Sequence, residues 1–190
     1  TASVCPAPGT TPQTGFAYLD QPNAPGHPIA MAHRGGAKHP DLVGIENTLQ
    51  AFEHAVRLGF NYLETDTHSS ADGTLFAFHD DTLERVTGHS GRIGDLSTNQ
   101  LQEIQIAGQH AIPKLDDLLE AFLDARMNID LKDDHAVEPL VRLIARHQAK
   151  DRVCVGSFSH RRLIRFRQAT SGRVATSASP LEVAAFLTLP

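Results

Sequence analysis

Two carboxylates two residues apart, Glu64 and Asp66, form the first candidate site in the sequence. They follow the apolar pair Tyr62-Leu63, and on a strand such positions share one face, about 6.5 Å apart. Carboxylates that close repel each other unless a cation lies between them, and their hard oxygen atoms suit Mg²⁺ or Ca²⁺. Because charged pairs also occur on solvated edge strands, this pair by itself leaves both interpretations open.

Asp130 and Lys132 repeat this spacing later in the chain, after the run Met127-Asn128-Ile129. Asp130 supplies a third carboxylate, which would complete the protein ligands of a Mg²⁺ or Ca²⁺ ion, with water or substrate filling the other positions. Lys132 would face the same opening as a cation suited to phosphate. A structural ion pair is the alternative for these two residues taken alone.

Two histidines, His33 and His79, each close an apolar run, and Arg34 follows the first of them. Singly, each is more often a solvent-facing or hydrogen-bonded histidine. Together, around a carboxylate pair, they indicate general acid–base catalysis near pH 7. The guanidinium of Arg34 adds a planar, permanently charged group that can clamp a phosphate.

These residues need strands to position them, and short apolar runs do alternate with helical patterns along the chain. The pattern predicts a mostly parallel α/β sheet. Polar residues end nearly every run, as expected for a (β/α)8 barrel, which collects its site from many strand ends. The run after the first strand lacks the G-x-G-x-x-G spacing of an open dinucleotide-binding sheet. We therefore predict a barrel, with strands starting near Ile29, Asn61, Leu75, Met127, Val153 and Arg173.

Six strand–helix units are fewer than a barrel needs, because a complete one takes about 250 residues. We predict an irregular proline-rich segment over residues 1–28 and a barrel domain, truncated after about six units, over residues 29–190. The expectation is that the natural protein continues past Pro190 by about 60 residues. The chain by itself should then be marginally stable, prone to associate, and weakly active or inactive.

Composition excludes several classes of protein. The net charge of −5 argues against nucleic-acid binding, which usually needs a basic surface. No apolar run approaches 18 residues, so no transmembrane helix is expected. The two cysteines, Cys5 and Cys154, are too far apart in sequence for a zinc motif and are expected as free thiols. Without a signal-peptide pattern the cytoplasm is favoured, although a trimmed N-terminus would look the same. The oligomeric state stays open.

An ordered set of motifs resembles the glycerophosphodiester phosphodiesterase family. The set comprises His33-Arg34-Gly35, Glu46-Asn47-Thr48, Glu64-Thr65-Asp66, Asp72-Gly73, His79-Asp80, Ile112-Pro113-Lys114-Leu115 and Asn128-Ile129-Asp130-Leu131-Lys132. The resemblance implies a (β/α)8 barrel, here without its last strands. It also implies roles: acid–base catalysis for His33 and His79, divalent-metal binding for Glu64, Asp66 and Asp130, and substrate contact for Arg34, Lys132, Glu46 and Asn47.

The resemblance implies metal-dependent hydrolysis of a small-molecule glycerophosphodiester to glycerol 3-phosphate and an alcohol, within lipid metabolism. Attack by water and attack by a neighbouring hydroxyl of the glycerol both remain open, as do Mg²⁺ and Ca²⁺. Two departures stand out: Asp130 lies where the family commonly has glutamate, and the loop from Ala37 to Ile45 is longer than usual. The alternatives are another divalent-metal barrel enzyme, such as a lyase or a phospholipase D-like enzyme, and an inactive truncated barrel that serves as a binding module.

Overall fold

A sheet of five parallel strands and one antiparallel strand organises the molecule, a computed structural model that describes residues 14–20 and 29–188. The parallel strands lie in the order β1-β2-β6-β7-β8. Their bounds are β1 Met31–His33, β2 Tyr62–Ser69, β6 Arg126–Leu131, β7 Val153–Gly156 and β8 Ala175–Thr176. Neighbours in chain order are neighbours in the sheet, as in a barrel wall, so the predicted barrel architecture is confirmed.

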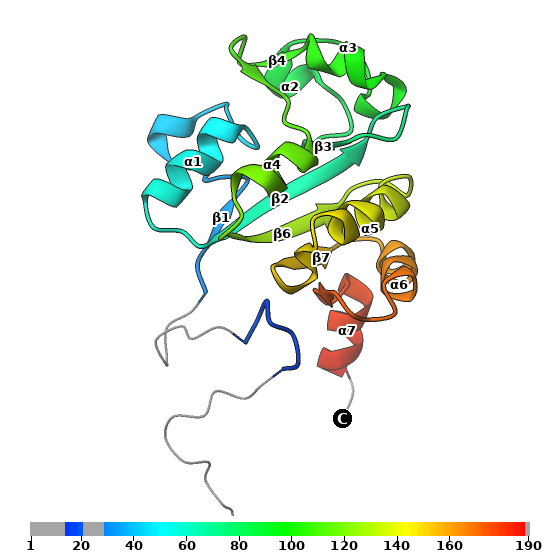
Figure 1. Ribbon diagram of the computed structural model, residues 1–190. Helices are drawn as coiled ribbons and strands as arrows, with labels where there is room; N and C mark the ends of the chain where they lie inside the picture. The colour runs from blue at the N-terminus through cyan, green and yellow to red at the C-terminus, as the bar shows by residue number, and fades with distance from the viewer. Residues whose placement is uncertain (1–13, 21–28, 189–190) are drawn as a thin grey trace, which may run out of the picture.

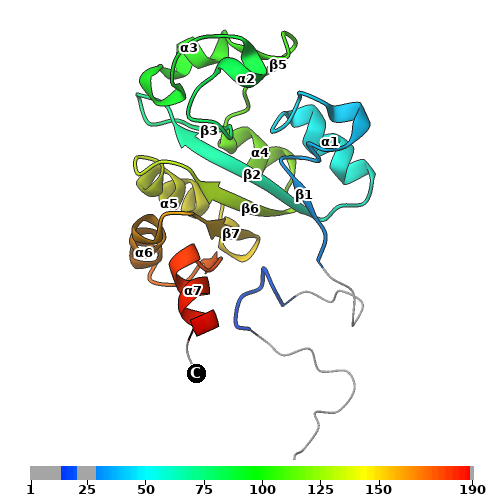
Figure 2. The same cartoon turned by 180° about the vertical axis from the view of Figure 1, so that it is seen from behind.

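Helices return the chain between the parallel strands and cover one face of the sheet, as Figure 1 shows. Figure 2 shows the sheet from its other face. The helices are α1 Leu49–Arg57, α4 Leu115–Ala121, α5 Val137–Arg146 and α6 His160–Ala169. The hydroxyl of Thr48 caps α1 by accepting from the Ala51 amide at 3.2 Å, which stabilises a helix start. Between the helices and the sheet lies the main core, with Phe52, Leu63 and Ile129 fully buried.

The run that starts at Leu75 does not begin a parallel unit, so that prediction was wrong. It forms β3, Leu75–Ala77, which pairs antiparallel with β2 through Thr67 and Ala77. The physical reason is the short connection, since a parallel neighbour needs a crossover of a dozen or more residues. Only the turn around Asp72-Gly73 joins the two strands, and Gly73 takes a φ of +88° there.

The segment after β3 forms a small excursion at the end of β2, above the sheet in Figure 1. It contains α2 Glu84–Thr87, α3 Thr98–Gln102, β4 Gln105–Ile106, β5 His110–Ala111 and a 3-10 turn at Ile93–Asp95. A separate apolar cluster that includes Phe76, Phe78 and Leu101 holds it together. This segment, the excursion, therefore has an apolar cluster of its own, and it carries His79.

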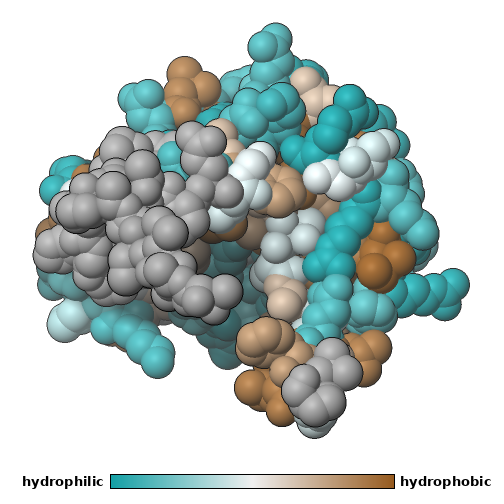
Figure 3. Space-filling view, turned by 90° about the horizontal axis from the view of Figure 1, so that it is seen from below, coloured by the Kyte–Doolittle hydropathy of each residue, from teal (hydrophilic) through white to brown (hydrophobic). Residues whose placement is uncertain are grey.

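The parallel sheet does not close within residues 29–188, because β1 and β8 are its two edges. The last described element, α7 Pro180–Thr188, leaves Val183, Phe186 and Leu187 exposed. Figure 3 shows apolar surface next to the chain end where α7 lies. None of the described helices is long and apolar enough to cross a membrane.

Part of the predicted irregular segment packs against the amino ends of the strands. Tyr18, which is 1% exposed, meets Tyr62 edge-on at 5.2 Å between ring centroids, and Cys154 and Ala175 join the same cluster. The Tyr62 hydroxyl donates to the Tyr18 carbonyl at 2.8 Å. Residues 1–13 and 21–28 of that predicted segment lie outside the described residues, so the boundary at residue 28 stays a prediction.

Candidate active site

Both predicted catalytic histidines reach the same edge of β2. β1 pairs with the first half of β2, which sets His33 beside Glu64, and β3 pairs with the second half on that side. Because β3 runs backwards along β2, the chain after it returns toward Asp66, and the Phe78 amide donates to the Asp66 carbonyl at 3.1 Å. His79 follows directly. The antiparallel hairpin thus brings His79 to the position where the sequence predicted the carboxyl end of a parallel strand.

The three predicted metal ligands come from the two central strands. Asp66 of β2 is in register with Asp130 of β6, and Glu64 lies two residues earlier on the same face as Asp66. Lys132 joins two of these acids, because its Nζ lies 2.8 Å from Asp66 Oδ1 and 2.6 Å from Asp130 Oδ2. The Glu64 carboxylate instead accepts from the Arg34 backbone amide at 2.9 Å.

A chain of alternating charges connects His79 to these acids. His79 Nδ1 lies 2.5 Å from Asp80 Oδ1, and the Arg85 guanidinium donates to Asp80 at 2.5 Å. Arg85 also donates to both oxygens of Glu46, at 3.0 and 2.6 Å. Glu46 in turn accepts from Arg34 Nη1 at 2.9 Å, and Arg34 Nε lies 3.3 Å from Asp66 Oδ2. The network therefore runs from the excursion to the central strands without a break.

Two residues beside Asp66, Arg34 and Asn47, have unusual backbone geometry. Arg34 has a φ of +52° and Asn47 a φ of +59°, a region that non-glycine residues seldom occupy and that concentrates at functional sites. Between them, Gly35 has no room for a side chain, since a Cβ there would lie 2.8 Å from the Ala51 Cβ. The His33-Arg34-Gly35 turn is thus pressed directly against helix α1.

Asn47, predicted to contact substrate, is 1% exposed and lies behind Asp66. Its side-chain amide donates to Asp66 Oδ2 at 3.1 Å, and its carbonyl oxygen accepts from the Thr65 hydroxyl at 2.9 Å. These two bonds orient the Asp66 carboxylate. Glu46 likewise contacts Arg34 and Arg85, so both residues of the Glu-Asn pair touch other side chains of the site.

Burial and charge shift several pKa values in the site. Burial and the neighbouring Asp66 raise the pKa of Glu64 to about 7. Burial and the positive charge of Arg34 lower the pKa of His33. The hydrogen bond from Arg85 lowers the pKa of Asp80 to about 2, so that residue stays a carboxylate beside His79.

The donor chemistry of the site fits a divalent cation. The three carboxylates come from the adjacent strands β2 and β6, and burial together with the neighbouring Asp66 raises the pKa of Glu64. The ammonium of Lys132 is the cation that bridges Asp66 and Asp130. Among the described residues, two groups of three have ligand atoms within 4.8 Å of one another, and both lie elsewhere. The three acids thus match the ion by chemistry, while Lys132 occupies the space between two of them.

A cavity of about 530 Å³ opens beside these acids. Glu64, Asp130 and Asn128 line one side of it, and Phe158 and apolar residues of α7 line the other. Phe158 is 82% exposed, and Lys132 Nζ lies 5.9 Å from the centre of its ring. The site therefore has a charged wall next to an apolar one.

Sequence reasoning did not assign a role in the site to Asp80, Arg85 or Phe158. A carboxylate directly after a candidate catalytic histidine was a usable signal for Asp80, and Arg85 stands in the same motif. His68 is buried, with Nε2 3.2 Å from the His79 carbonyl and Nδ1 3.4 Å from Asp133. Its ring thus holds the backbone of His79. No local signal marked Phe158.

Fold and site together define an α/β barrel-type protein with an acid, histidine and cation cluster at the carboxyl ends of its strands. Residues 33–188 match the model of the glycerophosphoryl diester phosphodiesterase family. The chain belongs to this family, which confirms the resemblance drawn from its motifs.

Relatives and solved structures agree with this assignment. The chain is 41% identical over 160 residues to "Probable glycerophosphodiester phosphodiesterase 2" of Mycobacterium tuberculosis, a match that covers 84% of the chain and 60% of that protein. It is 35% identical over 120 residues to a human lysophospholipase D, covering 56% of the chain and 37% of that protein. The structure of an Oleispira antarctica phosphodiesterase in complex with the product sn-glycerol-3-phosphate superposes with a TM-score of 0.69 at 25% identity, covering 78% and 64% of the two chains. The chain thus spans less than two thirds of the length of each of these proteins.

Proposed function

We propose that this protein hydrolyses glycerophosphodiesters to glycerol 3-phosphate and an alcohol, with His33 and His79 as its acid–base pair. The observation that carries the proposal is the meeting of both histidines at one edge of β2, beside Glu64 and Asp66. Two proton-transfer groups at one site match a displacement at phosphorus, since the nucleophile must lose a proton and the leaving alcohol must gain one.

The cationic residues neutralise the charge of the substrate. A phosphodiester is an anion, and attack on it needs positive charge where negative charge develops. The guanidinium of Arg34 and the ammonium of Lys132 both lie in the site and suit phosphate oxygens. Glu64, Asp66 and Asp130 would hold a divalent cation, Mg²⁺ or Ca²⁺, which supplies Lewis-acid stabilisation when bound.

Asp80 gives the two histidines different surroundings. It pairs with His79 Nδ1 and so holds that ring in one orientation. His33 lies 3.9 Å from Glu64 Oε2 and is the more exposed ring. We therefore assign His79 as the proton donor to the leaving alcohol and His33 as the acceptor from the nucleophile. Glu46 and Asn47 act by positioning Arg34 and Asp66.

A second substrate class, the lysophospholipids, is favoured by the apolar wall of the cavity. Phe158, Val183 and Leu187 line the same space as Glu64 and Asp130. An acyl chain could lie along such a wall while its phosphodiester faces the acids. The human relative named as a lysophospholipase D adds support for this second class.

Release of phosphorylated product tests both classes. The full-length protein is incubated with a glycerophosphodiester of a small alcohol, or with a lysophospholipid, each with and without a chelator. Glycerol 3-phosphate or a lipid phosphate should appear only without chelator and should be absent with the H33A variant. Turnover that survives the chelator would contradict metal dependence. Metal binding without turnover would favour the binding-module alternative.

A further inference from the structure

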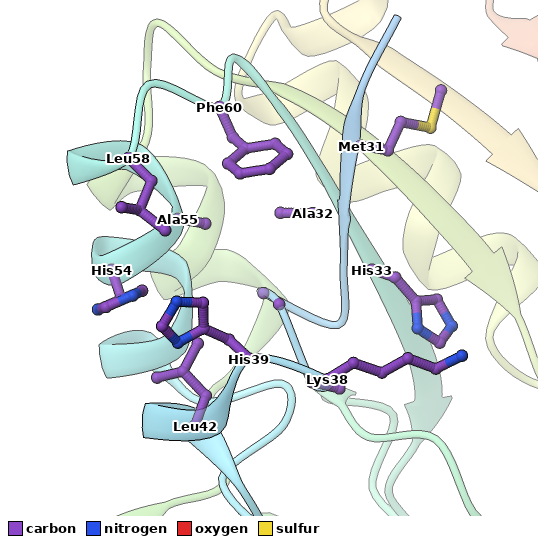
Figure 4. A pocket seen from close by; sticks show the side chains of 13 residues that line it. Met31, Ala32, His33, Lys38, His39, Leu42, His54, Ala55, Leu58 and Phe60 are labelled. Carbon is purple, nitrogen blue, oxygen red and sulfur yellow. The ribbon is translucent and has the colours of Figure 1, made fainter.

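A second cluster of histidine and carboxylate side chains lies outside the site described above. His39 and Asp41 belong to the 3-10 turn at Pro40–Leu42 and its start, and His54 lies on α1. One ligand atom of each residue lies within 4.8 Å of the other two. The ring centroids of His39 and His54 lie 4.7 Å apart, with the ring planes tilted by 56° to each other. Figure 4 shows the two rings as neighbours.

The Nε2 atom of His54 lacks a hydrogen-bond partner within the described part of the chain. This atom is also buried from solvent. A buried polar nitrogen without a partner costs free energy, so such an atom is a natural position for a ligand. His39 Nδ1 accepts from the Asp41 backbone amide at 3.3 Å and lies 3.8 Å from Asp41 Oδ2, so the carboxylate lies beside the His39 ring.

A similar cluster elsewhere shows what makes this one suitable. Asp116, Glu120 and His147 also bring their ligand atoms within 4.8 Å of one another. There, however, Asp116 already accepts from the Arg146 guanidinium at 2.5 Å and from His147. That arginine supplies the positive charge a cation would bring. Within residues 14–20 and 29–188, the ion pair recorded for Asp41 is the one with His39.

We propose that His39, Asp41 and His54 bind a divalent transition-metal ion of the Zn²⁺ class. Two imidazoles and one carboxylate are ligands such ions take, whereas Mg²⁺ and Ca²⁺ prefer oxygen alone. Three protein ligands leave further positions to solvent, and the Asp41 side chain is 73% exposed. This separates the cluster chemically from the all-carboxylate set in the active site.

The position of the cluster gives the ion a structural consequence. Figure 4 places His39 and His54 on the helix side of β1, away from His33, beside a cavity of about 390 Å³. An ion bound there would tie the loop from Ala37 to Ile45 to helix α1. The same loop leads directly into Glu46 and Asn47, which position Arg34 and Asp66. The metal would therefore brace the segment that orders the active site.

Calorimetric titration of the whole chain with Zn²⁺, in the presence of excess Mg²⁺, tests the proposal. The variants H39Q, H54Q and D41N should each weaken one Zn²⁺ site by about 100-fold or more, because even residues behind the ligands contribute 10–100-fold. D116N, from the other cluster, and H89Q, an exposed histidine, are the matched controls and should bind as the parent does.

A spectroscopic readout identifies the ligands independently of affinity. Co²⁺ added in place of Zn²⁺ should give a visible absorption band that H39Q and H54Q lose. Circular dichroism shows whether H54Q folds, and D41N changes a side chain at the surface, so it tests the site even if H54Q does not fold. Unchanged stoichiometry, with dissociation constants within about threefold in D41N and H39Q, would overturn the proposal. The proposal would also be overturned if E64Q lost Zn²⁺ binding while H39Q, D41N and H54Q kept it.

Discussion

The two ends of the same parallel strands differ sharply in chemistry. On β2, Tyr62, Glu64 and Asp66 share one face, yet the first packs in an apolar cluster while the last lies among cations. The amino end is covered by Tyr18 and joined by Cys154 of β7. Within four residues the strand thus passes from a packed apolar cluster to a charged site.

This contrast separates stability from chemistry along a single element. Side chains at the carboxyl end pair with one another, so removing one changes what the site can bind. Side chains at the amino end are buried against each other, so removing one changes the free energy of unfolding. Barrel enzymes in general place catalysis at the carboxyl end and stability at the other. Variants at the two ends should therefore move different measurements.

The largest effect is expected at the carboxyl end, for D66N. Asp66 contacts Lys132 and Asn47 and is one of the proposed metal ligands. Losing its charge should abolish Mg²⁺ or Ca²⁺ binding in calorimetry and lower kcat by at least about 10³-fold, because metal stabilisation is worth several kcal/mol. D116N is the control and should leave both values unchanged. Unaltered metal affinity in D66N would refute the ligand assignment.

The next largest effect is expected for H33A and H79A. Each should lower kcat by about 10²- to 10⁴-fold, the range for a lost general acid or base, while metal affinity stays the same. The bell-shaped pH profile of the parent should lose one limb in each variant. A histidine whose variant keeps near-parental turnover would have to be reassigned as structural.

At the amino end, Y18A should destabilise the fold without changing the chemistry. A large buried aromatic side chain replaced by alanine costs about 3 kcal/mol, measured as the free energy of unfolding by urea. Turnover per folded molecule should stay parental. Y18F is the matched control: within the described residues the Tyr18 hydroxyl is buried without a hydrogen-bond partner, so its removal should leave stability equal or slightly higher. A lower free energy of unfolding in Y18F would show that the Tyr18 hydroxyl does form a stabilising hydrogen bond.

The smallest effect is expected for R85A. Arg85 bridges Asp80 and Glu46 from a half-exposed position, so it orients His79 and Arg34 indirectly. We expect about a tenfold fall in kcat, with KM little changed, since supporting partners typically contribute at this scale. The pKa of Asp80 should rise from about 2, because the hydrogen bond from Arg85 is the largest cause of its low value. R85K should restore part of the activity. A parental pH profile in R85A would show that the bridge is only structural.

Local pattern was sufficient to predict the parallel strands of the sheet. The apolar runs ending at His33, Asp66 and Lys132 follow the strand period, and Thr48 and Gly59 mark the two ends of α1. The run from Leu75 has the same composition as a parallel strand, so composition could not give its direction. That direction depends on how short the turn at Asp72-Gly73 is.

By itself, the sequence determined the residue types of the site and their place at strand ends, because strand period and capping are local properties. Only the tertiary structure decided which of these residues meet. Arg85 pairs with Glu46 across 39 positions of the chain, and His79 reaches Asp66 because β3 folds back along β2. Asn47 is buried behind Asp66, which no local pattern could show. Pairings between distant segments follow from the packing of whole elements, and that packing is a property of the complete fold.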